Sequence, residues 1–425
     1  MFRPEDANHR PYSSQWNLTL ERELPHNFFF SASYVGTKGT HLPSQKSPIN
    51  VINPYNGQYQ QLASTPFTTY VQGVPTTVDT VLKADYNAVQ TTDEYGLEGY
   101  NGPTVFGAAG VSTPYTNWNN QLNPGAGAGS CSSTLAQALV PFPQYCGVEQ
   151  GLNEEHGNSL YNSFQARIER HMTHGLYVLG SMTISKMYTD ATETTQAAQD
   201  TGGGQNAFSP YNIKPLMALA EDNTPIIGSL ALVYDIPIGH DQRFLNAGPV
   251  SSVATGWKLA PITRYEYGVP FTFTSAACNV VSQVREGCLP GILPGQQLLL
   301  NGRNGFDPTK NNGQYINPNA LEPASNFTGP YGYLGTGMAV TTVYGSNYRD
   351  TDFSLIKETK IHERGSFVFT ANFFNAFNNH YFINTGQQTA VSSAFNTTVG
   401  STGFGQWNGT VSSPRTIQFS GRLEF

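Results

Sequence analysis

Hydrophobic and polar residues alternate along several separate stretches of the chain, and each stretch predicts a β-strand with one apolar face. The last twelve residues, 414–425, are an example. Ile417, Phe419, Leu423 and Phe425 fall on one side of the predicted strand, and polar residues fall on the other. A strand of a soluble sandwich can show the same pattern, so this stretch alone does not define its surroundings.

The same alternation predicts nine strands along the chain. Residues 15–24 and 28–42 form the first two, and the three-residue turn between them indicates a hairpin. The other predicted strands cover residues 159–170, 176–188, 228–239, 257–275, 350–361, 366–379 and 414–425. We therefore expect an all-β, antiparallel protein.

Short and long connections between these strands alternate along the chain. The short ones lie around residues 25–27, 173–175, 240–248 and 362–365, and the long ones cover residues about 43–158, 191–225, 277–346 and 383–413. A soluble sandwich has no reason to alternate in this way, whereas outer-membrane barrels have short periplasmic turns and long extracellular loops. The pattern predicts a transmembrane β-barrel of the outer-membrane type, here only its C-terminal part, with about 9–10 strands.

This topology also predicts that residues 1–425 are a fragment of one barrel domain. The ninth strand would end in the periplasm, and the first would begin on the extracellular side. Bacterial single-chain barrels have even strand numbers, and an unclosed sheet in lipid leaves unpaired backbone groups that cost several kcal/mol each. Whether the chain is a truncated gene product or a natural one stays open, as does the total strand number.

The composition of the chain argues against one class of partner and one kind of membrane segment. Charged residues are 12% of the chain, aromatic residues are also 12%, and the net charge is −7. This balance, without a dense basic cluster, argues against a nucleic-acid partner. The sequence contains no run of about 18 apolar residues for a transmembrane helix, and its start lacks the apolar core of a signal peptide.

Seven segments carry a resemblance to a known family. In chain order they are SASYVGTKGTHL, YNSFQARIER, VYDIPIGHDQRFLNAG, GWKLAPITRYEYGVPFTFT, DTDFSLIKETKI, ANFFNAFNNHYF and SPRTIQFSGRLEF. Together they resemble the C-terminal barrel of Oar-like TonB-dependent receptors of the acidobacterial type. The match runs along nearly the whole chain.

The resemblance implies location in the cell outer membrane and a part in the uptake of a large nutrient, such as an oligosaccharide, a peptide or a metal chelate. Relatives also have an export signal, a regulatory-like domain and a plug, which we expect to be absent here. The TonB complex would therefore act only through the missing plug. We expect contact with outer-membrane lipid and lipopolysaccharide. Phe425, with Phe419 and Leu423, would anchor the terminal strand and present it to the barrel assembly machinery.

The four cysteines fall in two of the long loops. Cys131 and Cys146 lie in the first, and Cys278 and Cys288 lie in the third. Four cysteines allow three pairings, and we favour a local disulfide within each loop. Both loops would be extracellular, where disulfides persist.

The sequence shows no signal for enzyme chemistry. GxSxG, HExxH and the phosphate-binding GxxxxGK[ST] motif do not occur in it. His171 and His174 are three residues apart, but they flank a predicted turn and have no third ligand nearby in the sequence. We expect no catalytic residues, no bound metal and no cofactor.

Two other interpretations of the function remain open. A secreted or surface-exposed adhesion module could pack the apolar faces into a sandwich and bind a glycan with its loops. A small self-contained outer-membrane pore would need a further strand within residues 43–158. Neither the substrate nor any individual ligand-contacting residue follows from the sequence.

Overall fold

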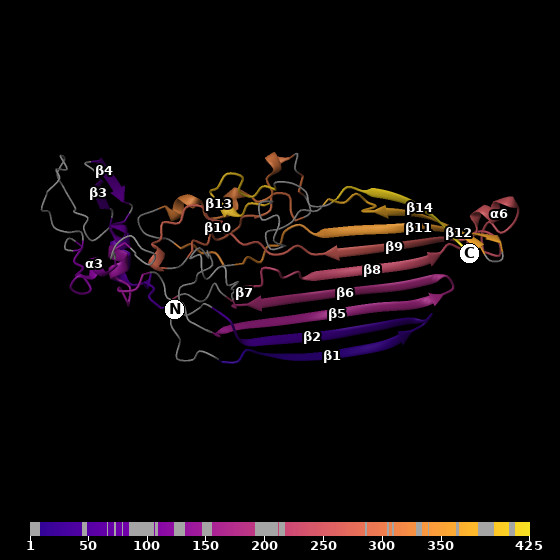
Figure 1. The fold of residues 1–425 in the computed structure, drawn as a ribbon, viewed down its shortest axis with the longest axis horizontal. Coiled ribbons are helices and arrows are strands. Elements are labelled where there is room, and N and C mark those ends of the chain that lie inside the picture. Colours follow the sequence, from indigo (N-terminus) through magenta and orange to yellow (C-terminus); the bar gives the residue numbers. More distant parts are fainter. Residues whose placement is uncertain are drawn as a thin grey trace.

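The computed structural model of the protein contains one large antiparallel sheet with long loops at one end (Figure 1). The structure describes residues 9–44, 49–65, 67–71, 74–78, 80–84, 106, 109–122, 132–146, 155–191, 211, 217–284, 287–303, 306–307, 310–328, 334–338, 340–362, 365–380, 395–407 and 413–425.

Nine long strands form the sheet, and each pairs with the strands before and after it in chain order. They are β1 (Tyr12–Leu24), β2 (Phe28–Leu42), β5 (Gly157–Thr173), β6 (Leu176–Thr189), β8 (Ile226–Asp235), β9 (Trp257–Glu266), β11 (Tyr348–His362), β12 (Gly365–Phe374) and β14 (Thr416–Glu424). A short strand, β7 (Ala218–Leu219), adds to β6. The nine predicted strands and the antiparallel fold class are confirmed.

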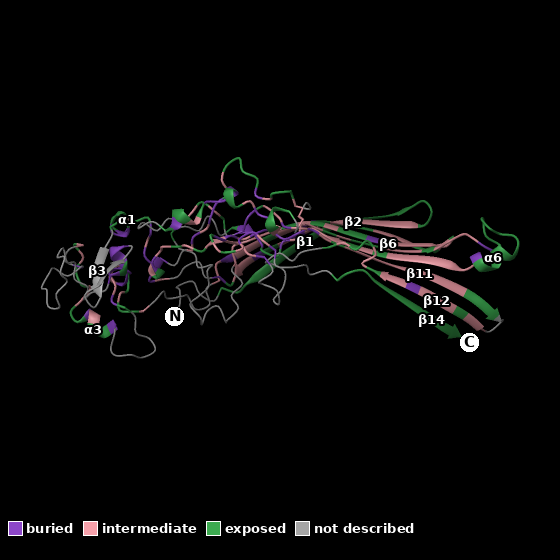
Figure 2. Ribbon diagram, turned by 90° about the horizontal axis from the view of Figure 1, so that it is seen from above, coloured by how far each residue is buried: buried purple, intermediate pink, exposed green. Residues whose placement is uncertain are grey.

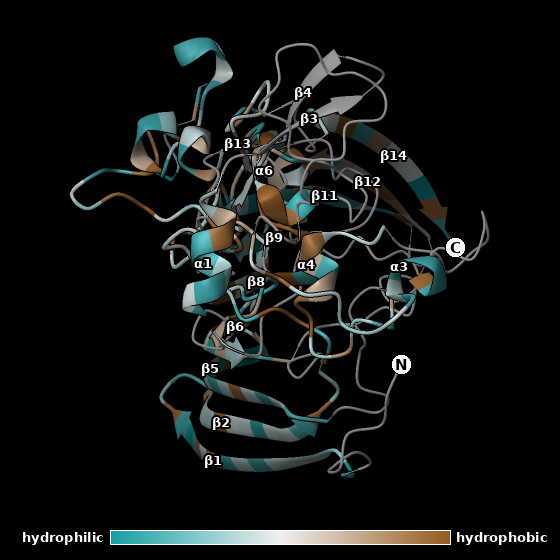
Figure 3. Ribbon diagram, turned by 90° about the vertical axis from the view of Figure 1, so that its left-hand side faces the viewer, coloured by the Kyte–Doolittle hydropathy of each residue, from teal (hydrophilic) through white to brown (hydrophobic). Residues whose placement is uncertain are grey.

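The sheet bends into an arc, with β1 and β14 at its two ends (Figure 3). Because side chains alternate between the two faces of a strand, the register decides which residues share a face. Phe353 on β11 lies opposite Pro261 on β9 and Phe373 on β12. The apolar positions of neighbouring strands therefore line up on one face of the whole sheet, and the polar positions line up on the other.

One predicted strand is too long. The sequence pattern predicts a strand from residue 257 to 275, but β9 ends at Glu266. Pro270 has no N–H to donate to a ladder, and a Cβ on Gly268 would lie 2.2 Å from the carbonyl oxygen of Gly345. The chain therefore leaves the sheet. Its next residues enter a core between loops, and β10 (Thr274–Ser275) pairs in parallel with β13 (Thr398–Val399).

One predicted turn is also wrong. The strand expected at 228–239 ends at Asp235, because Pro237 cannot continue the ladder. The connection to β9 then runs from residue 236 to 256 and includes the helix α6 (Pro249–Ala254). It lies at the end of the sheet that holds the short turns (Figure 1).

The long loops contain short elements of their own, where the sequence indicates no sustained period. The first loop holds α1 (Gly57–Ala63), β3 (Phe67–Val71), β4 (Val74–Val78), η1 (Val81–Lys83), α3 (Trp118–Leu122) and α4 (Leu135–Ala138). The third holds η2 (Ser282–Val284), η3 (Asn311–Gly313), η4 (Pro318–Ala320) and η5 (Ala324–Phe327). No described helix is long and apolar enough to cross a membrane.

Most buried residues lie in the loops, and few lie in the strands (Figure 2). The clusters of buried hydrophobic side chains lie almost wholly in residues outside the nine long strands. The sheet therefore has no core of its own on either face, and its apolar face must be covered by something other than this chain's described residues.

Candidate functional site

The apolar face of the sheet is widely exposed. Leu18 on β1 is 74% exposed, and Phe419 on β14 is 67% exposed. Between these strands, Phe353 and Phe373 stack with their ring centroids 4.4 Å apart. An apolar surface that extends from β1 to β14 is far larger than the apolar patches that soluble monomers expose to water. This face is therefore suited to contact with an apolar environment.

The height of this apolar band fits a lipid bilayer. On β9 the face carries Tyr265 near one end and Trp257 at the other, eight residues apart. At about 3.4 Å per residue the separation is roughly 27 Å along the strand, or about 20 Å along the normal for a strand tilted by about 40°. Outer-membrane barrels have an apolar band about 25 Å tall.

Aromatic residues flank the band, as membrane interfaces favour. Toward the long loops the face carries Tyr188 and Tyr265, and Lys186 and Arg349 lie over Tyr188 and Tyr265 at 4.9 and 5.8 Å. Toward the short turns it carries Phe28, Tyr234, Trp257 and Phe367, and Arg170 and Lys357 lie over Phe28 and Trp257 at 5.2 and 5.6 Å. The cations therefore sit at both rims of the band.

The tyrosines near the strand ends do not all lie on this face. Tyr12 shares it with Tyr34, Tyr188 and Tyr265, as the register shows. Tyr348 pairs with Glu266 and belongs to the polar face, where its hydroxyl donates to Asp350.

The polar face carries hydrogen bonds and ion pairs between its own side chains. Arg167 and Glu169 form an ion pair at 2.6 Å, and Arg264 pairs with Glu266. The Ser181 hydroxyl lies 2.8 Å from that of Ser229 on the next strand. A face of this kind suits the water-filled interior of a barrel.

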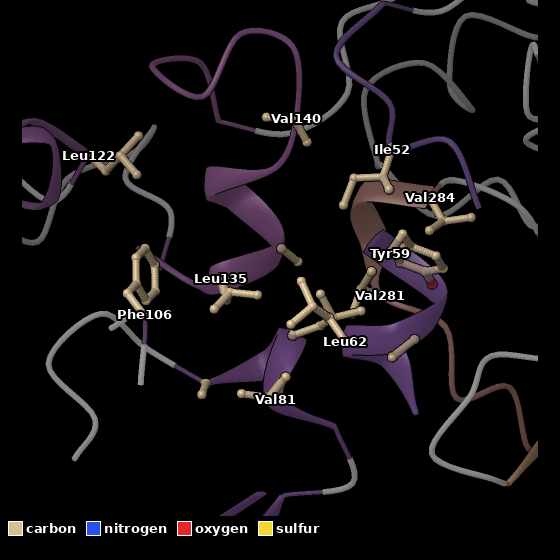
Figure 4. Packing of buried hydrophobic residues seen from close by; sticks show 14 of the residues in the cluster. Ile52, Tyr59, Leu62, Val81, Phe106, Leu122, Leu135, Val140, Val281 and Val284 are labelled. Atoms are coloured by element: carbon tan, nitrogen blue, oxygen red, sulfur yellow. The ribbon is translucent and has the colours of Figure 1, made fainter. Parts of the chain in front are cut away.

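The first long loop folds into a compact core with a segment of the third loop (Figure 4). Leu82 and Leu135 are fully buried in it, and Val281 and Val284 enter from the third loop. Asn56 caps α1 and Thr134 caps α4, so both helices begin with a satisfied backbone N–H.

Polar contacts join the two loops across this core. The Ile52 N–H donates to the Gln283 carbonyl at 2.9 Å, and the Gln283 side-chain amide donates to Gln137 at 3.3 Å. The Lys83 ammonium donates to the Asn279 amide oxygen. The first and third loops are therefore one folded unit, although about 200 residues separate some of these partners.

A disulfide joins Cys278 and Cys288 and encloses η2, the element that carries Val284 into the first loop core. Cys146 is also disulfide-bonded. The pairing expected for Cys146 involves Cys131, which lies outside the described residues. Both bonded loops lie at the end of the sheet away from the short turns.

Replacing Cys278 and Cys288 together by serine is expected to loosen the first loop core by roughly 2–3 kcal/mol, because the open chain of about ten residues has more freedom when unfolded. The measurement is the rate of proteolytic cleavage within residues 277–290. Val281→Ala, with the disulfide intact, serves as a control for packing alone. Equal protease resistance in the serine variant and the parent protein would contradict this prediction.

A second core joins the third and fourth loops. It contains a run of contacting rings, in which Phe271 lies 5.3 Å from Phe395 and 6.1 Å from Tyr315, and Phe395 lies 4.4 Å from Trp407. Phe271 and Phe273 are the residues that the sequence pattern assigned to a strand. Their burial between loops explains why apolar alternation continues past the end of β9.

Tyrosine and arginine side chains connect this second core to the strand ends. The Arg303 guanidinium lies 3.5 Å from the centroid of the Tyr267 ring, and that ring meets Tyr344 edge to face at 5.4 Å. Burial lowers the pKa of Arg303 from its usual range and raises the pKa of Tyr344. Asn223 from the second loop donates to the Tyr344 hydroxyl at 3.1 Å, so this loop is tied to the third.

The second core predicts a dependence of stability on pH. Burial raises the pKa of the Tyr315 phenol above its ordinary value of about 10, and its hydroxyl donates to the Arg303 carbonyl at 2.8 Å. The folded state therefore keeps this proton at pH values where the unfolded state loses it. The stabilisation is fully present below pH about 10 and is lost as the pH rises further, by up to about 1.4 kcal/mol per pH unit.

Tyr315→Phe is expected to remove this part of the slope. The comparison is the urea midpoint of the loop core, followed by tryptophan fluorescence between pH 9 and 11 in the two proteins. The two proteins share every other ionisable group. The difference between their slopes of urea midpoint against pH therefore reports on Tyr315 alone. Parallel slopes would show that Tyr315 is not protected in this way.

The remaining residues singled out in the sequence lie apart from the loop cores. His171 lies 3.8 Å from Glu169, and no group of three or more histidine, cysteine or acidic residues in the described part of the chain could hold a metal ion. Phe419, Leu423 and Phe425 are exposed on the apolar face of the last strand, Phe425 completely so. The loop cores themselves were missed by sequence reasoning, and the clustered aromatics of residues 271–273 and 395–407 were the available signal.

Residues 2–97 and 106–418 match the family described as "Outer membrane beta barrel domain", and the chain belongs to this family. No curated protein matches the chain. Among solved structures it is similar to the outer membrane transporter YddB from Escherichia coli, with 12% identity and a TM-score of 0.37 over 100% of this chain and 34% of that one. It is also similar to P. aeruginosa FpvA bound to a heterologous pyoverdine with iron, with 8% identity and a TM-score of 0.32 over 100% of this chain and 29% of that one.

The chain therefore spans about a third of the length of the solved transporters that it matches. Membership of the family places the protein in the outer membrane. The apolar face of the sheet is then the lipid-facing surface, the polar face is the lumen surface, and the loop cores lie at the extracellular end.

Proposed function

We propose that the chain is the C-terminal part of a TonB-dependent receptor barrel of the Oar-like type, and that it takes part in the binding and uptake of a large nutrient. The observation that carries the proposal is the folding of the outer loops. Segments of the first and third loops form one core, and segments of the third and fourth form another. Loops that only needed to be soluble would not require such cores, whereas a rigid surface suits ligand capture.

Exposed aromatic side chains on the first loop are candidate ligand contacts. Phe142 and Tyr145 follow α4 and are exposed, although the backbone that carries them is fixed. Asn50 accepts from the Phe142 N–H at 2.8 Å and donates to the Tyr145 carbonyl at 3.2 Å. Rigid aromatic groups of this kind can stack on sugars or on aromatic chelators at low entropic cost. The nutrient class remains an oligosaccharide, a peptide or a metal chelate.

The partners follow from the same proposal. Phe425 would present the last strand to the barrel assembly machinery, and lipopolysaccharide would contact the outer rim of the lipid-facing surface. The TonB complex would act through a plug and not through the strands and loops of this chain. These roles rest on the resemblance and on the exposed position of the last strand.

The test is uptake by the source bacterium with and without the gene for this protein. Labelled oligosaccharides, peptides and ferric chelates are supplied in turn. The expected result is that the deletion abolishes uptake of one class, and that this uptake stops in the parent strain when the inner membrane is de-energised. Phe142→Ser with Tyr145→Ser should reduce the same uptake, while Met172→Ser, an exposed residue near a short turn, should not.

Two results would overturn the proposal. Ion conduction by the purified protein in a planar bilayer, with no energy-dependent uptake of any of the three classes, would indicate a self-contained pore. A protein that is monodisperse and binds a glycan without detergent would indicate an adhesion module.

A further inference from the structure

We propose that the helix α6 lies in the periplasmic leaflet of the outer membrane and anchors the inner rim of the sheet to lipid. The partner is the boundary between phospholipid headgroups and acyl chains. This inference rests on the membrane-facing surface of the sheet and not on what the outer loops bind. The connection that contains α6, residues 236–256, is much longer than the other described turns at this end of the sheet.

The contacts of α6 place it on the lipid side of the rim. The Trp257 indole N–H donates to the Val253 carbonyl at 3.3 Å, and the Lys357 ammonium donates to the Thr255 carbonyl at 2.5 Å. Trp257 and Lys357 are paired across β9 and β11 on the apolar face. Trp257 and Lys357, which lie at the edge of the lipid-facing band, therefore hold the C-terminal end of this helix.

A glycine fixes the approach of α6 to the sheet. Gly256 has a φ of 83°, and a Cβ at this position would lie 2.3 Å from the Glu358 carbonyl oxygen. The Glu358 N–H in turn donates to the Gly256 carbonyl at 2.9 Å. This close contact determines the direction from which the chain enters β9, so α6 is not free to swing away from the rim.

The side of α6 away from the protein is apolar. Val250 is 59% exposed and Val253 is 69% exposed, and residues three apart share one side of a helix. Ser251 and Ala254, also three apart, are the buried pair. Ser251 is thus turned inward, while both valines face outward together with Ser252. Phe244 and Leu245, just before the helix, are exposed as well.

Cations border this apolar patch. Arg243 lies 5.4 Å from the centroid of the Phe244 ring, and Lys357 lies over Trp257. Neither Arg243 nor Lys357 belongs to an ion pair among the described residues, whereas Lys258 on the lumen face lies 3.9 Å from Asp235 and 3.8 Å from Glu358. Cations without an acidic partner beside exposed apolar groups match a phospholipid surface, where phosphates lie next to acyl chains.

The test uses a nitroxide label on single cysteines at Val250 or Val253 in protein reconstituted into phosphatidylethanolamine and phosphatidylglycerol vesicles. The described cysteines hold no free thiol, so the new cysteine is the labelling site. Labels at both positions are expected to collide several-fold more often with oxygen, which concentrates in lipid, than with a water-soluble nickel chelate. Ser252→Cys, on another side of the same helix, and Asn246→Cys in the preceding loop are the matched controls and should favour the nickel chelate.

Nickel accessibility at Val250 and Val253 equal to that at Asn246 would overturn the proposal and leave this face for an aqueous partner. A second readout does not depend on labelling. Val250→Asn with Val253→Asn should leave the uptake and the outer loops unchanged. In vesicles, however, residues 249–256 of this double variant should exchange their amide hydrogens faster than the same residues of the parent protein. Unchanged protection of these residues in the double variant would also count against the anchor.

Discussion

Phe353→Arg is expected to destabilise the folded protein in a bilayer by about 3 kcal/mol or more. Phe353 lies on the lipid-facing surface opposite Pro261, midway between Trp257 and Tyr265 and therefore near the centre of the apolar band. An arginine at the midplane of a barrel costs about 2–4 kcal/mol. Loss of the ring stack with Phe373 adds about 0.5–1.5 kcal/mol.

The measurement is guanidinium unfolding of the protein from phospholipid vesicles. Ser354→Arg is the matched control, because the next residue along the strand points to the lumen and an arginine there remains in water. The control is expected to lose less than about 1 kcal/mol, mainly from the hydrogen bond between Ser354 and Asn372. Equal losses in the two variants would show that the assignment of lipid and lumen faces is wrong.

The second large effect is expected from Phe271→Ala, at about 3–5 kcal/mol. Phe271 is fully buried between the third and fourth loops, in contact with the rings of Phe273, Tyr315 and Phe395. Removing its ring leaves a cavity that the surrounding aromatic side chains can fill only in part. The outer-loop core should therefore lose its fixed packing, and the rate of hydrogen exchange at residues 315–316 should rise.

The effect of Phe271→Ala should be confined to the outer loops. The strands are held by their own backbone ladders and by lipid. The temperature at which the strands unfold, followed by the change in electrophoretic mobility of heated samples, is therefore expected to stay the same. Phe244→Ala provides a control of the same chemical change at an exposed position in the 236–256 connection. If Phe271→Ala unfolded the strands together with the loops, the two parts would be one cooperative unit.

The alternation of apolar and polar residues determined most of the sheet. Strands such as residues 159–170 and 414–425 were predictable because the period of two residues is a local property of the chain and the register keeps it consistent across neighbours. Loop lengths, also local, indicated which end of each strand lies outside. The ends of two strands were predicted wrongly because of prolines. Pro237 and Pro270 end the backbone hydrogen-bond ladders of β8 and β9, although apolar and polar residues continue to alternate there.

Only the tertiary structure decided what the loops do. The first and third loops meet through Gln283 and Gln137, far apart in the sequence, and such pairing leaves no periodic signal in either loop. The position of α6 likewise depends on contacts from Trp257 and Lys357, which belong to two different strands. A local pattern specifies the face of a strand, whereas the packing of one loop on another depends on surfaces that exist only after the sheet has brought them together.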